Sequence, residues 1–194
     1  MSIRLATQKD LPRILEIYGP YILETPYSFE YTVPTLSEFT QRFSRITQQY
    51  PWLVWEENGQ VLGYAYGSAP FERAAYAWCA EASIYLCPQA QGRGIGKALY
   101  RALETLLTMQ GYQKLYVLIE GTNAVSLAFH QALGYQQFAV FSDCGYKLGG
   151  WHSIVWMEKP LNSVNAPASP PISFPFLVEN NEIPATFFDT FSLS

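Results

Sequence analysis

The feature that most constrains this chain is a glycine-rich turn between an apolar run and an amphipathic helix pattern. The apolar run covers residues 82–86, and the turn reads Gln91-Gly92-Arg93-Gly94-Ile95-Gly96. Apolar residues then recur at three- and four-residue steps to about residue 110, which predicts a helix with one buried face. Because the first N–H groups of a helix have no partner within it, a strand that turns through glycines into a helix is typical of a pyrophosphate site.

The residues around the turn separate three kinds of phosphate-binding loop. A P-loop requires Ser or Thr directly after its lysine, but Ala98 follows Lys97. A Rossmann fingerprint lies early in a chain and has an acidic residue about twenty positions on, whereas this turn lies mid-chain and Glu120 fits only loosely. The third kind, Gln/Arg-x-x-Gly-x-Gly/Ala, matches Gln91, Gly94 and Gly96.

That third pattern resembles the acyl-CoA pyrophosphate loop of the GNAT superfamily of N-acetyltransferases. Runs at residues 81–85, 130–135 and 145–152 are similar to the phosphinothricin and methionine sulfone N-acetyltransferases of that superfamily, as are residues 24–29 and 50–54. The resemblance covers roughly residues 2–160. It implies an α/β (α+β) fold: a twisted, mixed, mostly antiparallel sheet flanked by helices, with one parallel strand pair splayed to admit the cofactor.

Composition bounds the partners and the location of the protein. With 12 basic against 16 acidic residues and no Lys/Arg run, the chain lacks the charge expected of a protein that binds nucleic acid. Its apolar stretches are too short to span a membrane and residues 1–4 begin no signal-peptide pattern, so we expect no membrane partner and a cytoplasmic location. Cys79, Cys87 and Cys144 have no metal-like spacing, which predicts reduced thiols and no metal site; a functional thiol at Cys79 or Cys87 is the alternative.

The 194 residues predict one acetyltransferase domain, residues 1–160, and a Pro- and Phe-rich tail, residues 161–194. The aromatic residues of the tail favour docking on the domain or on a neighbouring subunit over disorder. Asn58-Gly59 predicts a tight hairpin, residues 27–33 an exposed strand or lid, and residues 21–24 a continuation of the first helix beyond Gly19-Pro20. We expect strands at 3–6, 52–55, 61–68, 77–86, 114–120, 135–141 and 152–158, the last two joined by a Gly-rich connection, and helices at 10–18, 35–48, from the glycine turn to 110, and 123–133.

Acetyl transfer to an amine requires a base, because an alkylamine near neutral pH is mostly protonated. Glu81 occupies the position of the proposed catalytic glutamate of the similar acetyltransferases; the alternative is a solvated glutamate on a strand. His130, five residues before the aromatic Tyr135, holds the position from which many GNAT enzymes protonate the CoA thiolate. The alternatives are a helix histidine bonded to a backbone carbonyl, and Tyr135 either as a second donor or as core packing.

The resemblance assigns acetyl-CoA to the strand before the turn, the turn itself and the next helix start, and it implies no metal. The strand edge would pair with the pantetheine amides as an added strand would, while the turn would hold the pyrophosphate. Asn123 would act as a helix cap, a CoA contact or both. The expected cofactor-binding residues are Ile84, Tyr85, Leu86, Gln91, Gly92, Arg93, Gly94, Ile95, Gly96, Lys97, Asn123 and Ser126.

For the acceptor, the resemblance implies an amino-acid-like molecule whose carboxylate meets a basic residue. The related enzymes commonly carry two basic residues before the catalytic strand, whereas Pro70-Phe71-Glu72-Arg73 offers one, which leaves the identity of the substrate open. The expected substrate-binding residues are Phe29, Glu30, Tyr31, Arg73, Trp78, Lys147 and His152, with Lys147 or His152 approaching from the partner subunit of a homodimer.

Together these inferences predict an acetyl-CoA-dependent N-acetyltransferase. Its acceptor would be of the methionine sulfone, methionine sulfoximine or phosphinothricin type, and it would attack the thioester directly in a ternary complex. The alternatives are acetylation of a peptide N-terminus or another small amine, and a non-catalytic regulatory module that binds acyl-CoA.

Overall fold

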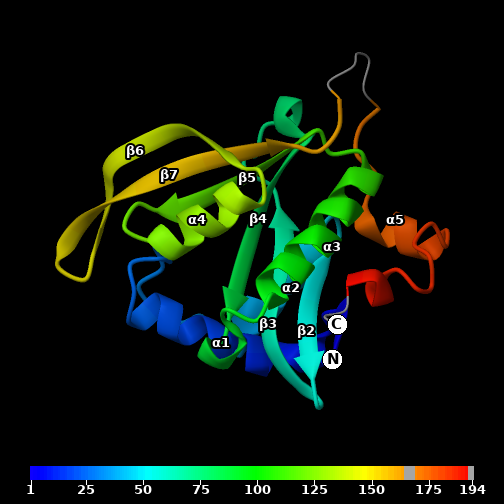
Figure 1. Ribbon diagram of the computed structural model, residues 1–194, viewed down its shortest axis with the longest axis horizontal. Helices are drawn as coiled ribbons and strands as arrows, with labels where there is room; N and C mark the ends of the chain where they lie inside the picture. The colour runs from blue at the N-terminus through cyan, green and yellow to red at the C-terminus, as the bar shows by residue number, and fades with distance from the viewer. Residues whose placement is uncertain (164–168, 192–194) are drawn as a thin grey trace.

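The computed structural model describes residues 1–163 and 169–191, and one seven-stranded sheet forms its centre (Figure 1). The strand order is β1-β2-β3-β4-β5-β7-β6, and every neighbouring pair is antiparallel except β4 and β5. The predicted mixed, mostly antiparallel sheet is therefore confirmed. The strands are β1 (Ser2–Leu5), β2 (Trp52–Glu57), β3 (Gln60–Ser68), β4 (Cys79–Leu86), β5 (Lys114–Glu120), β6 (Gln136–Lys147) and β7 (Gly150–Pro160).

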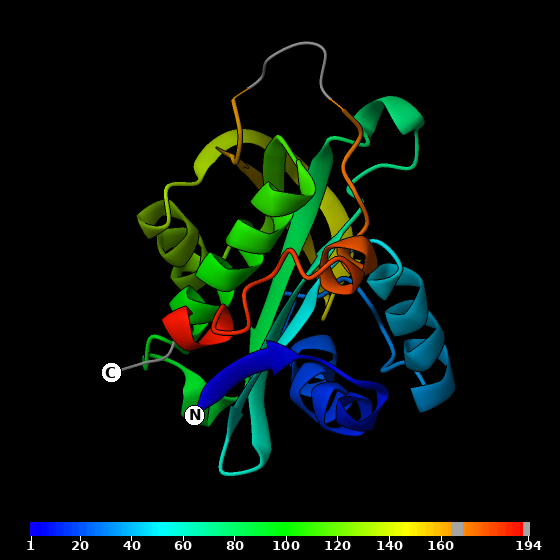
Figure 2. The same ribbon diagram turned by 90° about the vertical axis from the view of Figure 1, so that its right-hand side faces the viewer.

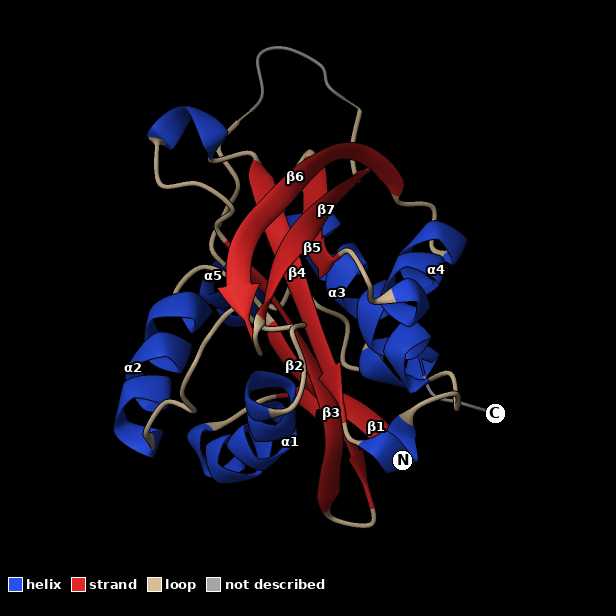
Figure 3. Cartoon of the chain, turned by 90° about the vertical axis from the view of Figure 1, so that its left-hand side faces the viewer, coloured by secondary structure: helices blue, strands red, loops and turns tan. Residues whose placement is uncertain are grey.

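Helices cover both faces of the sheet. Figure 3 shows α1 (Leu11–Leu23) and α2 (Leu36–Thr47) on one side, and α3 (Ile95–Gln110) and α4 (Ala124–Ala132) on the other. The side of α3 that faces the sheet is apolar, and Leu99, Leu103 and Leu106 are fully buried there. Burying each such side chain contributes about 1.5–3 kcal/mol. This burial anchors α3, and with it the glycine turn, against the strands.

Local sequence explains where several elements begin and turn. Thr35 caps α2 by accepting the N–H of Glu38, whose carboxylate accepts the N–H of Thr35 in return. Asn58 and Gly59 both have positive φ, 51° and 76°, as the predicted tight turn between β2 and β3 requires. Pro20 lies inside α1, so the predicted continuation of this helix is confirmed.

Residues 27–33 differ from a predicted strand, because they form neither strand nor helix. The hydroxyl of Ser28 accepts the N–H of Glu30 at 3.3 Å. Such local side-chain bonds compete with the pairing that a strand needs. This segment belongs to the loop between α1 and α2, residues 24–35, which is called the acceptor loop below.

Strands β6 and β7 are longer than predicted, because most of the expected Gly-rich connection is itself strand. A bulge between Phe141 and Gly145 interrupts the ladder, and Asp143 has a φ of 46° there. The reversal is confined to Leu148 and Gly149, with φ of 49° and 81°. The far end of the β6–β7 hairpin extends beyond the other strands of the sheet and curves back toward the end of α1 (Figure 1).

The C-terminal segment packs on the domain, and Figure 2 shows it passing from α5 (Phe174–Glu179) to a 3-10 helix (Phe188–Phe191) near β1 and α3. Phe174, Leu177 and Phe187 are buried in the same apolar core as the rest of the chain. Pro175 is compatible with α5 because it lies in the first turn. Residues 164–168 and 192–194 of the predicted tail, Pro167 included, lie outside the described residues.

None of the helices in the described part of the chain is long and apolar enough to cross a bilayer.

Candidate active site

The parallel strands β4 and β5 separate after a short stretch of pairing. They pair from Cys79 with Lys114 to Glu81 with Tyr116 and no further within the described residues. Beyond that point a narrow cleft of about 80 Å³ opens between them, as the resemblance implied. Its lining comes from α1, α3, α4, β4, β5 and the acceptor loop: Tyr21, Tyr27, Glu81, Ala82, Ser83, Ile84, Tyr85, Tyr100, Val117, Leu118, Ile119, Glu120, Asn123, Ser126 and His130.

Glu81 lies at the inner end of this cleft, at the last position where β4 pairs with β5. Its carboxylate has no hydrogen-bond or ion-pair partner among residues 1–163 and 169–191. Burial raises the pKa of this carboxyl from 4.5 to about 7, because the charged form loses hydration. An acid with that pKa exchanges protons readily near neutral pH.

His130 faces the same cleft from α4, opposite β4, but both of its ring nitrogens are already bonded. Its Nδ1 lies 2.8 Å from the backbone carbonyl of Ser126, which can only accept, so Nδ1 carries the hydrogen. Nε2 then accepts the hydroxyl hydrogen of Tyr100 at 2.8 Å. Burial lowers the pKa of His130 to about 4, so the ring is neutral near neutral pH.

Tyr135 does not line the cleft. Gly134, with a φ of 92°, turns the chain after α4 so that the Tyr135 ring packs beside α3. Its hydroxyl donates to Oε1 of Glu104 at 2.9 Å, and the ammonium of Lys159 lies over its ring. The surroundings of Tyr135 are therefore those of a packed core residue.

The glycine turn presents free N–H groups at the start of α3. Gly92 and Gly94 have φ of 71° and 83°, a backbone conformation that other residues rarely adopt. Gly94 has no side chain to cap the helix, and the N–H groups of Ile95, Gly96 and Lys97 have no partner among the described residues. The helix dipole adds partial positive charge at the same place. This arrangement suits a diphosphate.

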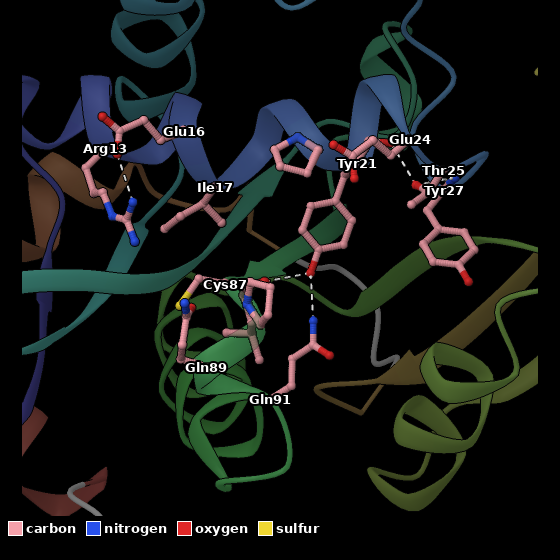
Figure 4. A pocket seen from close by; sticks show the side chains of 13 residues that line it. Arg13, Glu16, Ile17, Tyr21, Glu24, Thr25, Tyr27, Cys87, Gln89 and Gln91 are labelled. Atoms are coloured by element: carbon pink, nitrogen blue, oxygen red, sulfur yellow. Dashed lines mark hydrogen bonds and ion pairs between the residues drawn. The ribbon is translucent and has the colours of Figure 1, made fainter.

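Two polar side chains of the turn are engaged elsewhere. Arg93 forms an ion pair with Glu57 at 2.8 Å, and Gln91 reaches the hydroxyl of Tyr21 at 3.4 Å. Figure 4 shows Tyr21 and Gln91 meeting at the edge of a second hollow, of about 350 Å³, between α1 and the segment after β4. Lys97 is exposed at the first turn of α3, where its charge remains available.

The start of α4 contributes two further predicted residues to the cleft. Asn123 caps this helix by accepting the N–H of Ser126 at 3.1 Å, and both residues line the cleft. The predicted cap is therefore confirmed, whereas contact of either residue with CoA remains a prediction. Ile84 and Tyr85 line the cleft as well, and Leu86 lines the neighbouring hollow.

Five predicted acceptor residues meet where the acceptor loop touches the β6–β7 hairpin. The ammonium of Lys147 donates to the carbonyl of Ser28, and the hydroxyl of Tyr31 donates to the carbonyl of Tyr146. Lys147 is buried, which lowers the pKa of its amine. Lys147 or His152 was expected from a partner subunit, but the hairpin brings Lys147 to the acceptor loop of its own chain, and His152 bonds to Glu120 and to the carbonyl of Lys147. The full set is Phe29, Glu30, Tyr31, Lys147 and His152.

Two predicted acceptor residues lie away from the cleft. Trp78 precedes β4, and its indole N–H donates to the carbonyl of Ser169 in the C-terminal segment at 3.0 Å. Arg73 is exposed at the start of a short 3-10 helix, and its guanidinium makes no hydrogen bond or ion pair with the described residues. Neither lines the cleft.

Sequence reasoning missed Tyr100, Ser83 and Glu120 as cleft residues. Tyr100 belongs to the apolar face of α3. Because a hydroxyl on a buried face needs a hydrogen-bond partner, its presence there could have indicated a polar contact. Ser83 alternates with Glu81 along β4 and therefore shares its face. Glu120 entered the sequence argument only as a loose match to another loop. In residues 1–163 and 169–191, no three His, Cys, Asp or Glu side chains are grouped to hold a metal ion.

Comparisons with known proteins agree with this geometry. Residues 3–156 match the family described as an acetyltransferase (GNAT) domain. A phosphinothricin N-acetyltransferase of Streptomyces viridochromogenes is 33% identical over 159 residues, 82% of this chain and 87% of that protein. An L-methionine sulfoximine/L-methionine sulfone acetyltransferase of Salmonella typhimurium is 33% identical over 168 residues, 86% of this chain and 98% of that protein.

Solved structures with the same fold include enzymes of more than one kind. A GNAT superfamily phosphinothricin acetyltransferase from Sinorhizobium meliloti, in complex with AcCoA, has a TM-score of 0.82 and 37% identity over 89% of this chain and 97% of that chain. A ribosomal-protein-alanine N-acetyltransferase from Brucella melitensis has a TM-score of 0.80 and 30% identity over 82% of this chain and 99% of that chain.

Proposed function

Because this chain belongs to the GNAT family of acetyltransferases, we propose that it transfers the acetyl group of acetyl-CoA to the amine of a small amino-acid-like acceptor. The proposed acceptors are methionine sulfone, methionine sulfoximine and phosphinothricin, after the names of the similar enzymes. One observation carries the proposal. The cleft between β4 and β5 has the carboxylate of the half-buried Glu81 at its inner end and the N–H groups of the first turn of α3 beyond its outer end, and none of these groups has a partner in the described part of the chain.

The cleft and the turn have groups that fit acetyl-CoA, which would supply the thioester. N–H groups of Ile95, Gly96 and Lys97 would hold the pyrophosphate. From Ala82 onward β4 has no partner on the β5 side in the described chain, so its backbone groups would pair with the pantetheine amides. Arg93 would contribute only on leaving Glu57.

Two side chains of the cleft would handle protons and developing charge. Glu81, once ionised, would take a proton from the acceptor ammonium through a water and leave a neutral amine to attack. The hydroxyl hydrogen of Tyr100 would turn from His130 toward the departing sulfur, because a neutral His130 holds that hydrogen without removing it. We therefore propose that His130 acts as the hydrogen-bond partner of Tyr100. Tyr135 could contact the thiolate only if its hydroxyl gave up its hydrogen bond to Glu104.

A second function is acetylation of a peptide N-terminus. It is favoured by the structural similarity to the ribosomal-protein-alanine N-acetyltransferase and by the single basic residue in residues 70–73. The acceptor loop argues for a small acceptor, because it lines the cleft through Tyr27 and is held by its bonds to the β6–β7 hairpin.

CoA-thiol release over a panel of amines separates these functions. We expect release with methionine sulfone, methionine sulfoximine or phosphinothricin, and little with peptides that begin in alanine. Release with the peptides alone would support the second function. Binding of acetyl-CoA without release for any amine would indicate a regulatory module and contradict both.

We also propose that the protein acts as a homodimer in the cytoplasm. The β6–β7 hairpin exposes a row of large apolar side chains, which favours contact with a second copy. These are Phe138, Val140, Phe141, Tyr146, Leu148 and Trp151.

A further inference from the structure

A connected series of hydrogen bonds runs from the cleft to the acceptor loop, and Glu120 is its first member. The carboxylate of Glu120 lines the cleft and is only 1% exposed. One of its oxygens accepts the N–H and the hydroxyl of Thr122 at 2.9 and 2.6 Å. The other lies 2.9 Å from Nδ1 of His152. Because a buried carboxylate without partners would be costly, these bonds fix the His152 ring next to β5.

His152 passes this constraint to the end of β6. Its Nε2 donates to the backbone carbonyl of Lys147 at 3.0 Å. A carbonyl only accepts, so the ring is held from both sides, by Glu120 and by Lys147. Lys147 is the last residue of β6, directly before the turn at Leu148 and Gly149. The position of this turn is therefore tied to a residue of the cleft.

Lys147 in turn holds the acceptor loop. Its buried ammonium donates to the carbonyl of Ser28, whose hydroxyl lies 2.9 Å from that of Tyr18 in α1. The ring of Phe29 lies directly over Gly145, where a Cβ would come within 2.2 Å of it. The loop thus rests against the hairpin, and the bond from Lys147 is the one that involves a charge.

We propose that Glu120, His152 and Lys147 form a positioning relay that holds the acceptor loop over the cleft and so sets the affinity for the acceptor amine. The link to the acceptor rests on the proposed function, whereas the hold on the loop does not. All three residues act through the loop. The bond of the Glu120 carboxylate to His152 and the bond of the Lys147 ammonium to Ser28 each involve a charged group, so breaking either bond costs more free energy than breaking a neutral one.

Limited digestion with chymotrypsin tests the hold on the loop without requiring any enzymatic activity. The loop contains three sites for this protease, Tyr27, Phe29 and Tyr31, each partly exposed. We expect Glu120→Gln and Lys147→Met each to speed cleavage there by about tenfold, the effect of losing one hydrogen bond to a charged group. Because the relay acts in series, the double variant should be cut no faster than Lys147→Met.

A matched control is available on the same two strands. Lys114 of β5 and Glu158 of β7 form an ion pair at 2.8 Å at the opposite end, away from the acceptor loop. Glu158→Gln should leave the cleavage rate as in the wild type. His152→Gln is a milder variant that removes the bridging ring, and its melting temperature reports whether it folds. Cleavage of Glu120→Gln and His152→Gln at the wild-type rate would overturn the relay, and so would additive effects in the double variant.

Steady-state kinetics test the link to the acceptor. We expect Glu120→Gln to raise the acceptor KM by about tenfold while kcat and the Kd of acetyl-CoA change little. An unchanged KM together with faster cleavage would show that the loop does not govern acceptor binding. That result would overturn the proposed link between the relay and the affinity for the acceptor. If the wild type acetylates no amine, the proposed function fails, while digestion still decides whether the relay holds the loop.

Discussion

At the scale of single residues, the central feature is the carboxylate of Glu81, which has no hydrogen-bond or ion-pair partner in the part of the chain that the structure describes. A glutamate on a solvated strand has an ordinary pKa, but Glu81 lies where two strands part, and burial raises its pKa to about 7. An acid of that strength exchanges protons with an amine near neutral pH more readily than an ordinary glutamate. The same burial costs stability, as is common at functional sites.

Replacing the carboxylate tests this role. We predict that Glu81→Gln lowers turnover by at least about tenfold, the low end of what general acid–base catalysis supplies. The affinity for CoA should be nearly unchanged, because the pyrophosphate contacts lie in the glycine turn. Thiol release gives the rate and calorimetry the affinity. Unchanged turnover would remove Glu81 from the mechanism.

The pH dependence has a defined sign. A base must be ionised, so turnover of the wild type should rise as pH increases through about 7, and this rise should be lost in Glu81→Gln. Stability follows the opposite direction: the folded-state pKa lies above 4.5, so the folded protein holds this proton more tightly and loses stability as pH rises through about 7. Glu81→Gln should therefore melt above the wild type in alkaline buffer. A lower melting temperature there would contradict the raised pKa.

Which site residues were predictable depends on whether their role follows from local sequence. Asn123 was predicted because a helix cap is a local feature, whereas the role of Glu81 was inferred from the family resemblance and remains a prediction. Trp78 was misplaced because its indole N–H bonds to Ser169, a partner distant in sequence. Tyr100 was missed because the sequence shows it only as part of an apolar helix face, and its bond to His130 requires two helices to pack together.

At the scale of elements, the glycine turn and α3 were predicted well because periodicity and glycine chemistry act within one segment. The β6–β7 hairpin was predicted short, since a Gly-rich run does not reveal that Gly145 is needed in a strand for close approach of Phe29. For residues 27–33 of the acceptor loop, the sequence predicted either an exposed strand or a lid. The conformation of this loop is set by contacts with that hairpin, more than a hundred residues away in sequence.

The start of α3 yields a prediction about the cofactor. Gly94 has a φ of 83°, where a side chain costs about 1–2 kcal/mol. We predict that Gly94→Ala weakens CoA binding by about tenfold, because relief of this strain moves the N–H groups of the first turn. Calorimetric titration with CoA measures the effect.

The other end of the same helix provides the control. Gly111 has a φ of 94°, and its Cβ would make only ordinary contact with Pro171. Gly111→Ala should lose comparable stability and keep its CoA affinity. Equal loss of affinity in both variants would show that the turn has no special role.

At the scale of the whole molecule, the C-terminal segment is part of the fold. The change in composition near residue 160 marks a change in chain character, but the core does not end there, because Phe174, Leu177 and Phe187 are buried with residues of β1 and α3. Backbone bonds from Ile172 to Gln110 and from Phe174 to Gln49 fasten the segment in place. Composition alone could not show which surface these aromatic residues cover.

Leu177 tests this interpretation because it is fully buried beside exposed neighbours. Leu177→Ala should lower the free energy of unfolding by about 2–5 kcal/mol, through lost burial and the cavity left behind. Its kcat/KM should be unchanged, because the segment does not line the cleft. Urea denaturation measures the loss, and Val178→Ala, at an exposed site, serves as the control. Stability within about 0.5 kcal/mol of the wild type would contradict the integration of this segment.

The central claim is that one cleft joins the cofactor to the base, and a crystal structure of the protein with bound CoA tests it most directly. We predict the diphosphate against the N–H groups of Ile95, Gly96 and Lys97, the pantetheine along β4 from Leu86 toward Ala82, and the sulfur at the end of the cleft that holds Glu81. CoA bound with its diphosphate away from the glycine turn, or with its sulfur outside the cleft between β4 and β5, would contradict the account.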